Sequence, residues 1–138
     1  MQIKHFDDLK AAGLAQPEPQ RLLILLLHAE AAADGKAVTR KGVTTGRGTL
    51  TPVMATDLEL TPELDLATIV EEADSLGKPW QMMLVSSLAG RPGQPPTSEQ
   101  ASGYLEQMAE AVVTGGDLGR YAVFDRTGSP VKLQADGY

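Results

Sequence analysis

The 138-residue sequence contains no cysteine. This absence excludes disulfide bonds, zinc–thiolate sites, iron–sulfur clusters and a thiol nucleophile. Aromatic residues are also scarce, with two Phe, three Tyr and one Trp, and the net charge of −6 repels phosphate backbones. We therefore expect no nucleic-acid partner.

Long hydrophobic runs are missing as well. The longest aliphatic run, Leu22 to Leu27, is far shorter than the roughly 20 residues that span a bilayer as a helix. The N-terminal stretch MQIKHFDDLK carries acidic residues where a signal peptide would be apolar. We expect a soluble cytoplasmic protein with no membrane contact. Its 42% hydrophobic composition suffices for one globular domain over residues 1–138, with no metal or other cofactor needed for stability.

Three stretches predict strands. The run Leu22–Leu27 is typical of a strand buried on both faces, although Pro19 and Gly35 would also frame a helix, and we interpret it as a central strand. The stretch WQMMLVSSLAG predicts a second interior strand. Residues 49–56 contain Pro52, which indicates an irregular or edge strand because proline cannot donate to a ladder.

The end of the chain, YAVFDRTGSPVKL, predicts a hairpin that turns at Thr127 and Gly128. Residues 32–48 are rich in glycine and basic residues and predict a long exposed loop. The glycines and prolines of residues 89–97 indicate a connector.

Helical spacing indicates three helices. A short N-terminal helix contains Phe6 and Leu9 and ends near Gly13. A second begins with Thr61 as N-cap and continues to Gly77. Thr97 or Ser98 caps the third, with capping-box spacing between Thr97 and Gln100. Its predicted apolar stripe is Ala101, Tyr104, Leu105, Met108, Ala111 and Val112.

These elements predict an α+β or α/β domain. We expect a mixed sheet of about five strands, on which two main helices and the short N-terminal helix pack. Crossovers between its interior strands would be right-handed.

The stretch SSLAGRPGQPPTSEQ, residues 86–100, has two interpretations. A strand that leads through a glycine-containing loop to a helix N-terminus can bind an anion, because free N–H groups and the helix dipole converge there. The residues of this candidate site are Ser87, Arg91, Thr97 and Ser98, with Arg47 from the basic loop. However, the three prolines each remove an N–H donor, which favours a stiff connector instead.

Three segments, QPEPQRLLILLL, LTPVM and SSLAGRPGQPPTSEQA, resemble a family of small uncharacterised bacterial proteins. Members of this family often carry the inherited label ribonucleotide reductase alpha subunit. The resemblance implies a bacterial protein and supports a strand at Leu22–Leu27. The label implies cysteine chemistry in a large barrel, which this short chain without cysteine does not fit.

The sequence predicts a non-catalytic protein-binding or regulatory module. We expect it to engage another protein, or identical copies of itself, through an edge strand or exposed loops. The alternative is a small-molecule anion-binding protein, or an enzyme acting on an anion, that uses residues 86–100.

Overall fold

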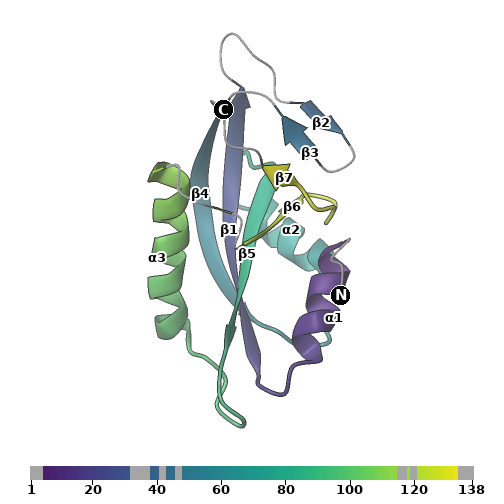
Figure 1. The fold of residues 1–138 in the computed structure, drawn as a ribbon, viewed down its shortest axis with the longest axis vertical. Helices are drawn as coiled ribbons and strands as arrows, with labels where there is room; N and C mark the ends of the chain where they lie inside the picture. The colour runs from purple at the N-terminus through teal and green to yellow at the C-terminus, as the bar shows by residue number, and fades with distance from the viewer. Residues whose placement is uncertain are drawn as a thin grey trace.

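The computed structural model describes residues 5–31, 38–40, 43–45, 48–114, 118 and 121–133. Within these ranges the chain forms three helices and an open four-stranded antiparallel sheet (Figure 1). The helices are α1 (Phe6–Leu14), α2 (Leu66–Asp74) and α3 (Ser98–Thr114). Across the sheet, the strands are β4 (Gly48–Glu59), β1 (Gln20–Ala31), β5 (Met82–Ala89) and β6 (Ala122–Asp125).

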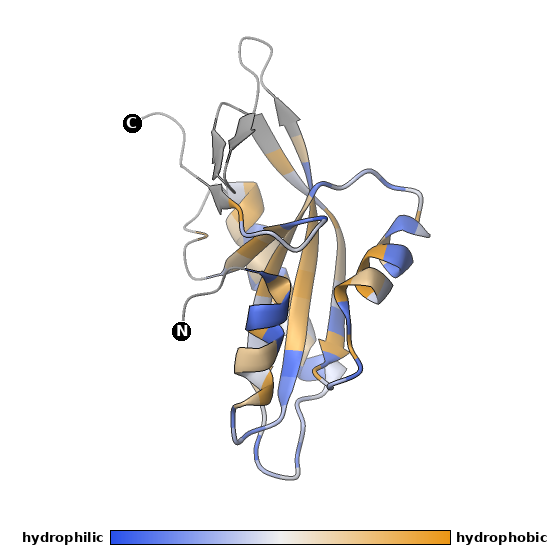
Figure 2. Cartoon of the chain, turned by 90° about the vertical axis from the view of Figure 1, so that its right-hand side faces the viewer, coloured by the Kyte–Doolittle hydropathy of each residue, from blue (hydrophilic) through white to orange (hydrophobic). Residues whose placement is uncertain are grey.

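The central strand β1 is buried on both faces, as predicted for the run Leu22–Leu27. Side chains of Leu22, Ile24 and Leu26 pack with residues of α1 and α2, whereas Leu23, Leu25 and Leu27 pack with residues of α3. This division follows from the alternation of side chains along a strand. Figure 1 accordingly shows α3 on one side of the sheet and α1 with α2 on the other, and Figure 2 shows the hydrophobic centre of the sheet.

The predicted mixed sheet of about five strands is wrong in two respects. Its principal sheet has four strands, and every neighbouring pair in it is antiparallel. The prediction failed because a continuous apolar run reports burial on both faces and not strand direction. Here helices cover both faces of an antiparallel sheet, so its central strand has the composition expected in a parallel one.

At one end of the sheet, β4 is an edge strand, as the proline at position 52 indicated. The pairing register of β1 with β4 shifts between Leu26, opposite Met54, and Leu27, opposite Pro52. This shift is a β-bulge, a feature that bends edge strands. The strand also extends to Glu59, beyond its predicted end at Thr56.

A second sheet contains β2 (Val38–Arg40), β3 (Val43–Thr45) and β7 (Lys132–Leu133). The first two strands correct the prediction of a loop over residues 32–48, the rest of which lies mostly outside the described residues. The predicted C-terminal turn is present, because Gly128 has a φ of 85° and Val131 N–H donates to Val123 C=O at 2.8 Å. However, β7 pairs with β3 and not with β6.

The helix boundaries depend on local capping. The N-cap of α2 is Asp65, whose carboxylate accepts from Thr68 N–H at 2.8 Å, so the predicted cap at Thr61 is wrong. Thr61 instead begins a turn, since its C=O accepts from Leu64 N–H at 3.1 Å. The predicted capping box of α3 is confirmed: Gln100 N–H donates to Thr97 Oγ1 at 3.2 Å, and Thr97 N–H donates to Gln100 Oε1 at 3.0 Å.

The predicted apolar stripe of α3 is confirmed for its buried members, which are Ala101, Leu105, Met108 and Val112. Tyr104 differs from the prediction, because 49% of it is exposed. None of the helices in the described ranges is both long enough and apolar enough to cross a membrane.

We expect the substitution Ile24→Ala to lower the free energy of unfolding by about 2–5 kcal/mol, because it leaves a cavity in the core between β1 and the α1 and α2 helices. Ile24 is 0% exposed. Urea unfolding would measure the change. The control is Val113→Ala on α3, where the side chain is 71% exposed, and for which we expect at most about 0.5 kcal/mol. Equal losses in the two variants would contradict this packing.

Candidate functional site

Among the described residues, β6 pairs with the first half of β5 and not with its second half. The short strand β6 pairs with Met82–Val85 only, and Val85 faces Ala122, the first residue of β6. Burial changes at the same point: residues 82–85 are buried, whereas Ser87 and Ala89 are exposed. Among the residues that the structure describes, no strand pairs with residues 86–89 on the side where β6 would continue. We call Ser86–Ala89 the open β5 edge.

The direction of the backbone groups follows from three hydrogen bonds around β5. Gly90 N–H donates to Pro19 C=O at 2.8 Å, so Gly90 and alternate residues before it face β1. Val131 N–H donates to Val123 C=O, so Val123 faces away from β5, and its neighbours Ala122 and Phe124 face β5. Both observations put the N–H and C=O groups of Ser87 and Ala89 on the open side.

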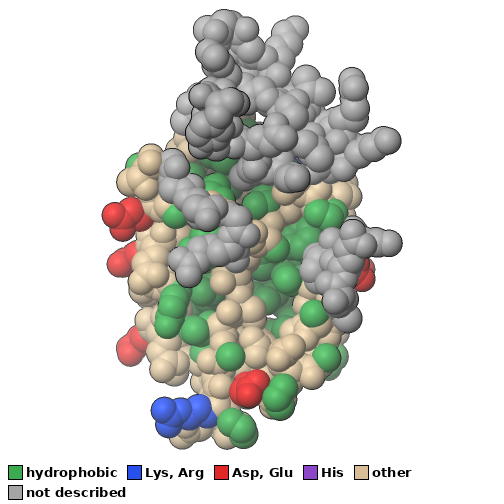
Figure 3. Space-filling view, in the orientation of Figure 1, with side chains coloured by type: hydrophobic (Ala, Val, Ile, Leu, Met, Phe, Trp, Pro, Cys, Tyr) green, Lys and Arg blue, Asp and Glu red, His purple; other side chains and the backbone are tan. Residues whose placement is uncertain are grey.

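An apolar surface flanks the open β5 edge on the side of α3. Ser98 Oγ donates to Asp57 Oδ1 of β4 at 2.9 Å, so this flank of α3 faces β4. Tyr104 lies about 120° from Ser98 around the helix, across the buried stripe of α3, and so on the flank away from β4. Leu88, on the same sheet face, is half-buried against the core under α3. Figure 3 shows apolar side chains gathered over β5, between α3 and the two other helices.

The opposite flank of the open β5 edge carries a polar pair of side chains. Ser87 Oγ donates to Gln20 Oε1 at 2.7 Å, and Gln20 is 8% exposed. The two flanks therefore differ in chemistry. An extended segment laid along β5 would meet apolar groups with one set of alternate side chains and polar groups with the other set.

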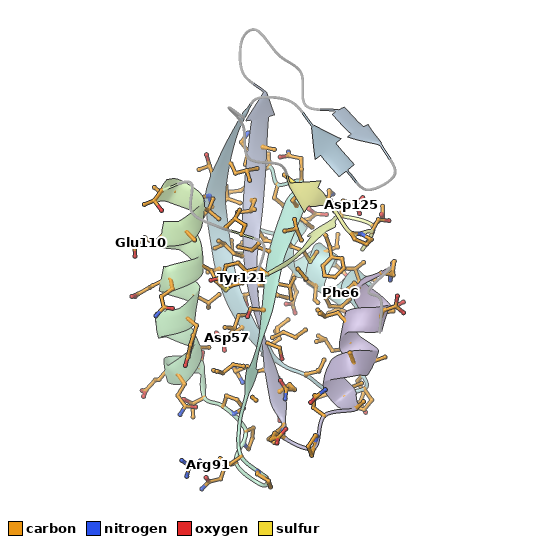
Figure 4. All side chains as sticks on the ribbon, in the orientation of Figure 1. Phe6, Asp57, Arg91, Glu110, Tyr121 and Asp125 are labelled. Atoms are coloured by element: carbon orange, nitrogen blue, oxygen red, sulfur yellow. The ribbon has the colours of Figure 1, made fainter. Side chains whose placement is uncertain are left out.

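A tight turn closes the lower end of β5. Arg91 N–H donates to Gln94 C=O at 3.0 Å, and Gln94 N–H donates back to Arg91 C=O at 2.8 Å. Pro92 and Gly93 occupy the two central positions, and Gly93 has a φ of 77°, which favours glycine there. This turn places Arg91 at the tip of the molecule, whereas Tyr121 lies near the start of β6 (Figure 4).

A hollow of about 440 Å³ lies between this turn and the segment that joins α1 to β1. Gln20, the partner of Ser87, contributes to its wall, so the hollow adjoins the open β5 edge. Of its lining residues only Glu18 is charged, which favours an uncharged occupant over an anion. Four of the eleven lining residues are prolines: Pro17, Pro19, Pro92 and Pro95.

The predicted anion-binding residues are only partly brought together. Thr97 and Ser98 are neighbours at the start of α3, but both hydroxyl groups are already bonded, Thr97 within its capping box and Ser98 to the carboxylate of Asp57. Ser87 bonds Gln20, and Arg91 lies on the exposed turn. Arg47 lies outside the described residues. Anion binding stays a prediction, which a carboxylate beside Ser98 does not favour.

One cluster of charged and aromatic groups joins α2 to the turn after β6. Arg126 Nη2 lies 2.6 Å from Asp74 Oδ2, and its guanidinium stacks 4.3 Å from the centre of the Trp80 ring. Trp80 Nε1 also donates to Asp74 at 3.0 Å. The hydrogen bond from Arg126 is the main cause that lowers the pKa of Asp74. Because these groups satisfy one another, we interpret the cluster as a structural latch.

Sequence reasoning chose the residues of a loop and missed the backbone of β5. The signal was present in part, because YAVFD is much shorter than WQMMLVSSLAG. A short strand beside a long one leaves part of the long strand unpaired. Within the described ranges, no group of three or more His, Cys, Asp or Glu side chains could hold a metal ion.

The latch predicts a pH dependence of stability. Asp74 has a lower pKa in the folded state than its ordinary value near 3.8, so its ion pair stabilises the fold above that value and is lost as the pH falls through the lowered pKa. We expect Arg126→Gln to be less stable than the wild type at pH 7, with a difference that shrinks below pH ~4. Thermal unfolding against pH measures it. A constant difference would contradict the latch, and Arg91→Gln on the exposed turn is the control.

The open β5 edge predicts an alternating pattern of amide exchange. We expect fast hydrogen exchange at Ser87 and Ala89, because their N–H groups face outward, and slow exchange at Ser86 and Leu88, which face β1. Two-dimensional NMR in deuterated buffer resolves the four amides. Equal protection of all four would show that another part of the chain covers the edge.

Comparisons of this chain with protein-family models, curated proteins and solved structures found no match. The resemblance to small bacterial proteins therefore stays a prediction. The open β5 edge is the feature of the described residues from which we infer a function.

Proposed function

We propose that the chain is a non-catalytic protein-binding module, which binds an extended segment of a partner protein as an added strand along the open β5 edge. The observation that carries this proposal is the change of burial within β5, from fully buried where β6 pairs to alternately exposed beyond Val85. Strand addition of this kind obtains affinity from main-chain hydrogen bonds and specificity from alternate side chains.

The geometry of the edge specifies the chemistry of the bound segment. Ser87 and Ala89 each offer one N–H and one C=O, and the four residues of the open β5 edge span about 14 Å. Side chains on the α3 side would lie beside Tyr104 and Leu88, whereas those on the other side would meet Ser87 and Gln20. The partner segment should therefore alternate apolar and polar residues.

The core around this edge supports a preformed site. Leu84 and Val85, immediately before the edge, are 0% and 1% exposed, so the strand is held in place before any partner arrives. A rigid edge loses little conformational entropy on binding, which increases affinity for a given set of contacts. The backbone itself supplies the recognition, so the proposal requires no catalytic side chain.

Peptide display tests the proposal. A library of random 12-residue peptides is selected against the immobilised full chain, and we expect enrichment of peptides with alternating apolar and polar residues. Bound peptide should slow amide exchange at Ser87 and Ala89. We expect Ala89→Pro to weaken binding at least tenfold, because it removes an outward N–H group without breaking the pairing with β1.

Two matched controls separate binding from folding. Ala89→Val retains the N–H group and should bind like the wild type, while melting curves show whether each variant is folded. On α3, Tyr104→Ala should weaken binding, whereas Val113→Ala on the other flank should not. If selection enriches no peptide, or if the peptides bind Ala89→Pro and Tyr104→Ala as tightly as the wild type, the proposed site is wrong.

A further inference from the structure

The sheet has a second open edge at its other end, along β4. In the order of the four strands β4 stands last, with β1 as its one neighbour among the strands that the structure describes. Leu60 N–H donates to Gln20 C=O at 2.9 Å, so Leu60 and alternate residues before it face β1. The N–H and C=O groups of Ala55, Asp57 and Glu59 consequently face outward.

A β-bulge limits the part of β4 that could pair with a further strand. The bulge at Pro52 and Val53 interrupts the regular ladder, and a proline there offers no N–H to a further strand. Beyond the bulge, the pairing with β1 is regular from Met54 to Glu59, and residues 53–59 contain no proline. An added strand would therefore pair with residues 53–59.

This segment is complementary to itself in one antiparallel register. With Thr56 opposite Thr56 of a second copy, each Asp57 faces Ala55 and each Glu59 faces Val53, so the acidic residues avoid one another. Moving the two-fold axis to Asp57 would place like charges directly opposite, which destabilises a strand pair. Moving it to Ala55 would bring Pro52, which has no N–H, opposite Leu58.

The apolar side chains of β4 would gain cover in the same register. Met54 and Leu58 are only half-buried against the core beside α2, and each would face the other across the axis. Ala55 is small and exposed, so it does not obstruct a second strand. The carboxylate of Asp57 is paired with Arg21 of β1 in the same chain.

We propose that two copies of this chain associate through β4, with residues 53–59 antiparallel and Thr56 on the two-fold axis. The two four-stranded sheets then form one continuous antiparallel sheet. This surface lies at the opposite end of the sheet from the open β5 edge, so each surface can be tested without disturbing the other.

Cysteine cross-linking tests the register in a chain that has no cysteine of its own. On the axis, facing residues of a non-hydrogen-bonded pair have Cα atoms about 4.5 Å apart, which suits a disulfide. We expect Thr56→Cys to form a covalent dimer on mild oxidation. In the control Ala55→Cys, the two cysteines are diagonal neighbours across the strand pair, with Cα atoms about 7–8 Å apart. We therefore expect several-fold less cross-linking.

Charge substitution provides a second, independent measurement. The new side chain of Ala55→Lys would face Asp57 of the second copy and tighten the dimer, whereas that of Ala55→Glu would weaken it. We expect the dissociation constant from analytical ultracentrifugation to change roughly two- to thirty-fold in each direction, because two symmetric pairs are altered. A wild type that stays monomeric at millimolar concentration, or equal cross-linking by the two cysteine variants, would overturn the proposal. Equal weakening of the dimer by Ala55→Lys and Ala55→Glu would also overturn the proposal. If Ala55 lay on the two-fold axis, two like charges would face each other in either variant.

Discussion

The burial of β1 on both faces is the constraint on which the rest of the structure depends. Six consecutive aliphatic side chains, Leu22 to Leu27, leave neither face of the strand suited to water. An antiparallel sheet often leaves one face solvated, but this sequence does not permit that. Helices must therefore cover both faces, and α3 on one side with α1 and α2 on the other meets this requirement.

Covering both faces restricts where the sheet can contact another molecule. The helices occupy the broad surfaces, and what stays accessible of the sheet is backbone at its margins. Residues 130–131 pair with the outer side of β6, where Val131 N–H donates to Val123 C=O. This pairing protects the edge of the sheet along β6. Within the described part of this four-stranded sheet, the open β5 edge and β4 are then the places where strand groups have no partner strand, a condition that proteins normally limit.

The sequence predicted what depends on local patterns and failed on what depends on pairing. Three features were predictable because each depends on side-chain periodicity or local hydrogen bonding. They are the strand at Leu22–Leu27, the edge position of the strand with Pro52, and the Thr97–Gln100 capping box. The direction of the strands was not predictable, since it depends on which strands, distant in the sequence, become neighbours. Thr61 and Asp65 both have side chains that can cap a helix, and the structure begins α2 at Asp65, while Thr61 begins a turn. For the same reason, sequence analysis selected side chains of residues 86–100 as a candidate site and did not consider the backbone of residues 86–89.

The glycine- and proline-rich connector between β5 and α3 acquires a structural role in this account. A side chain at Gly90 would place its Cβ 2.4 Å from the backbone oxygen of Gln94 and 2.7 Å from the Pro96 ring, so the connector folds tightly back at that point. Pro96 is buried, and Thr97 immediately begins the capping box. Few torsions are then free between the open β5 edge and the α3 flank that carries Tyr104. The prolines remove hydrogen-bond donors from an anion site, but they fix the backbone edge and the apolar helix flank relative to each other. That preorganisation is what an added strand requires.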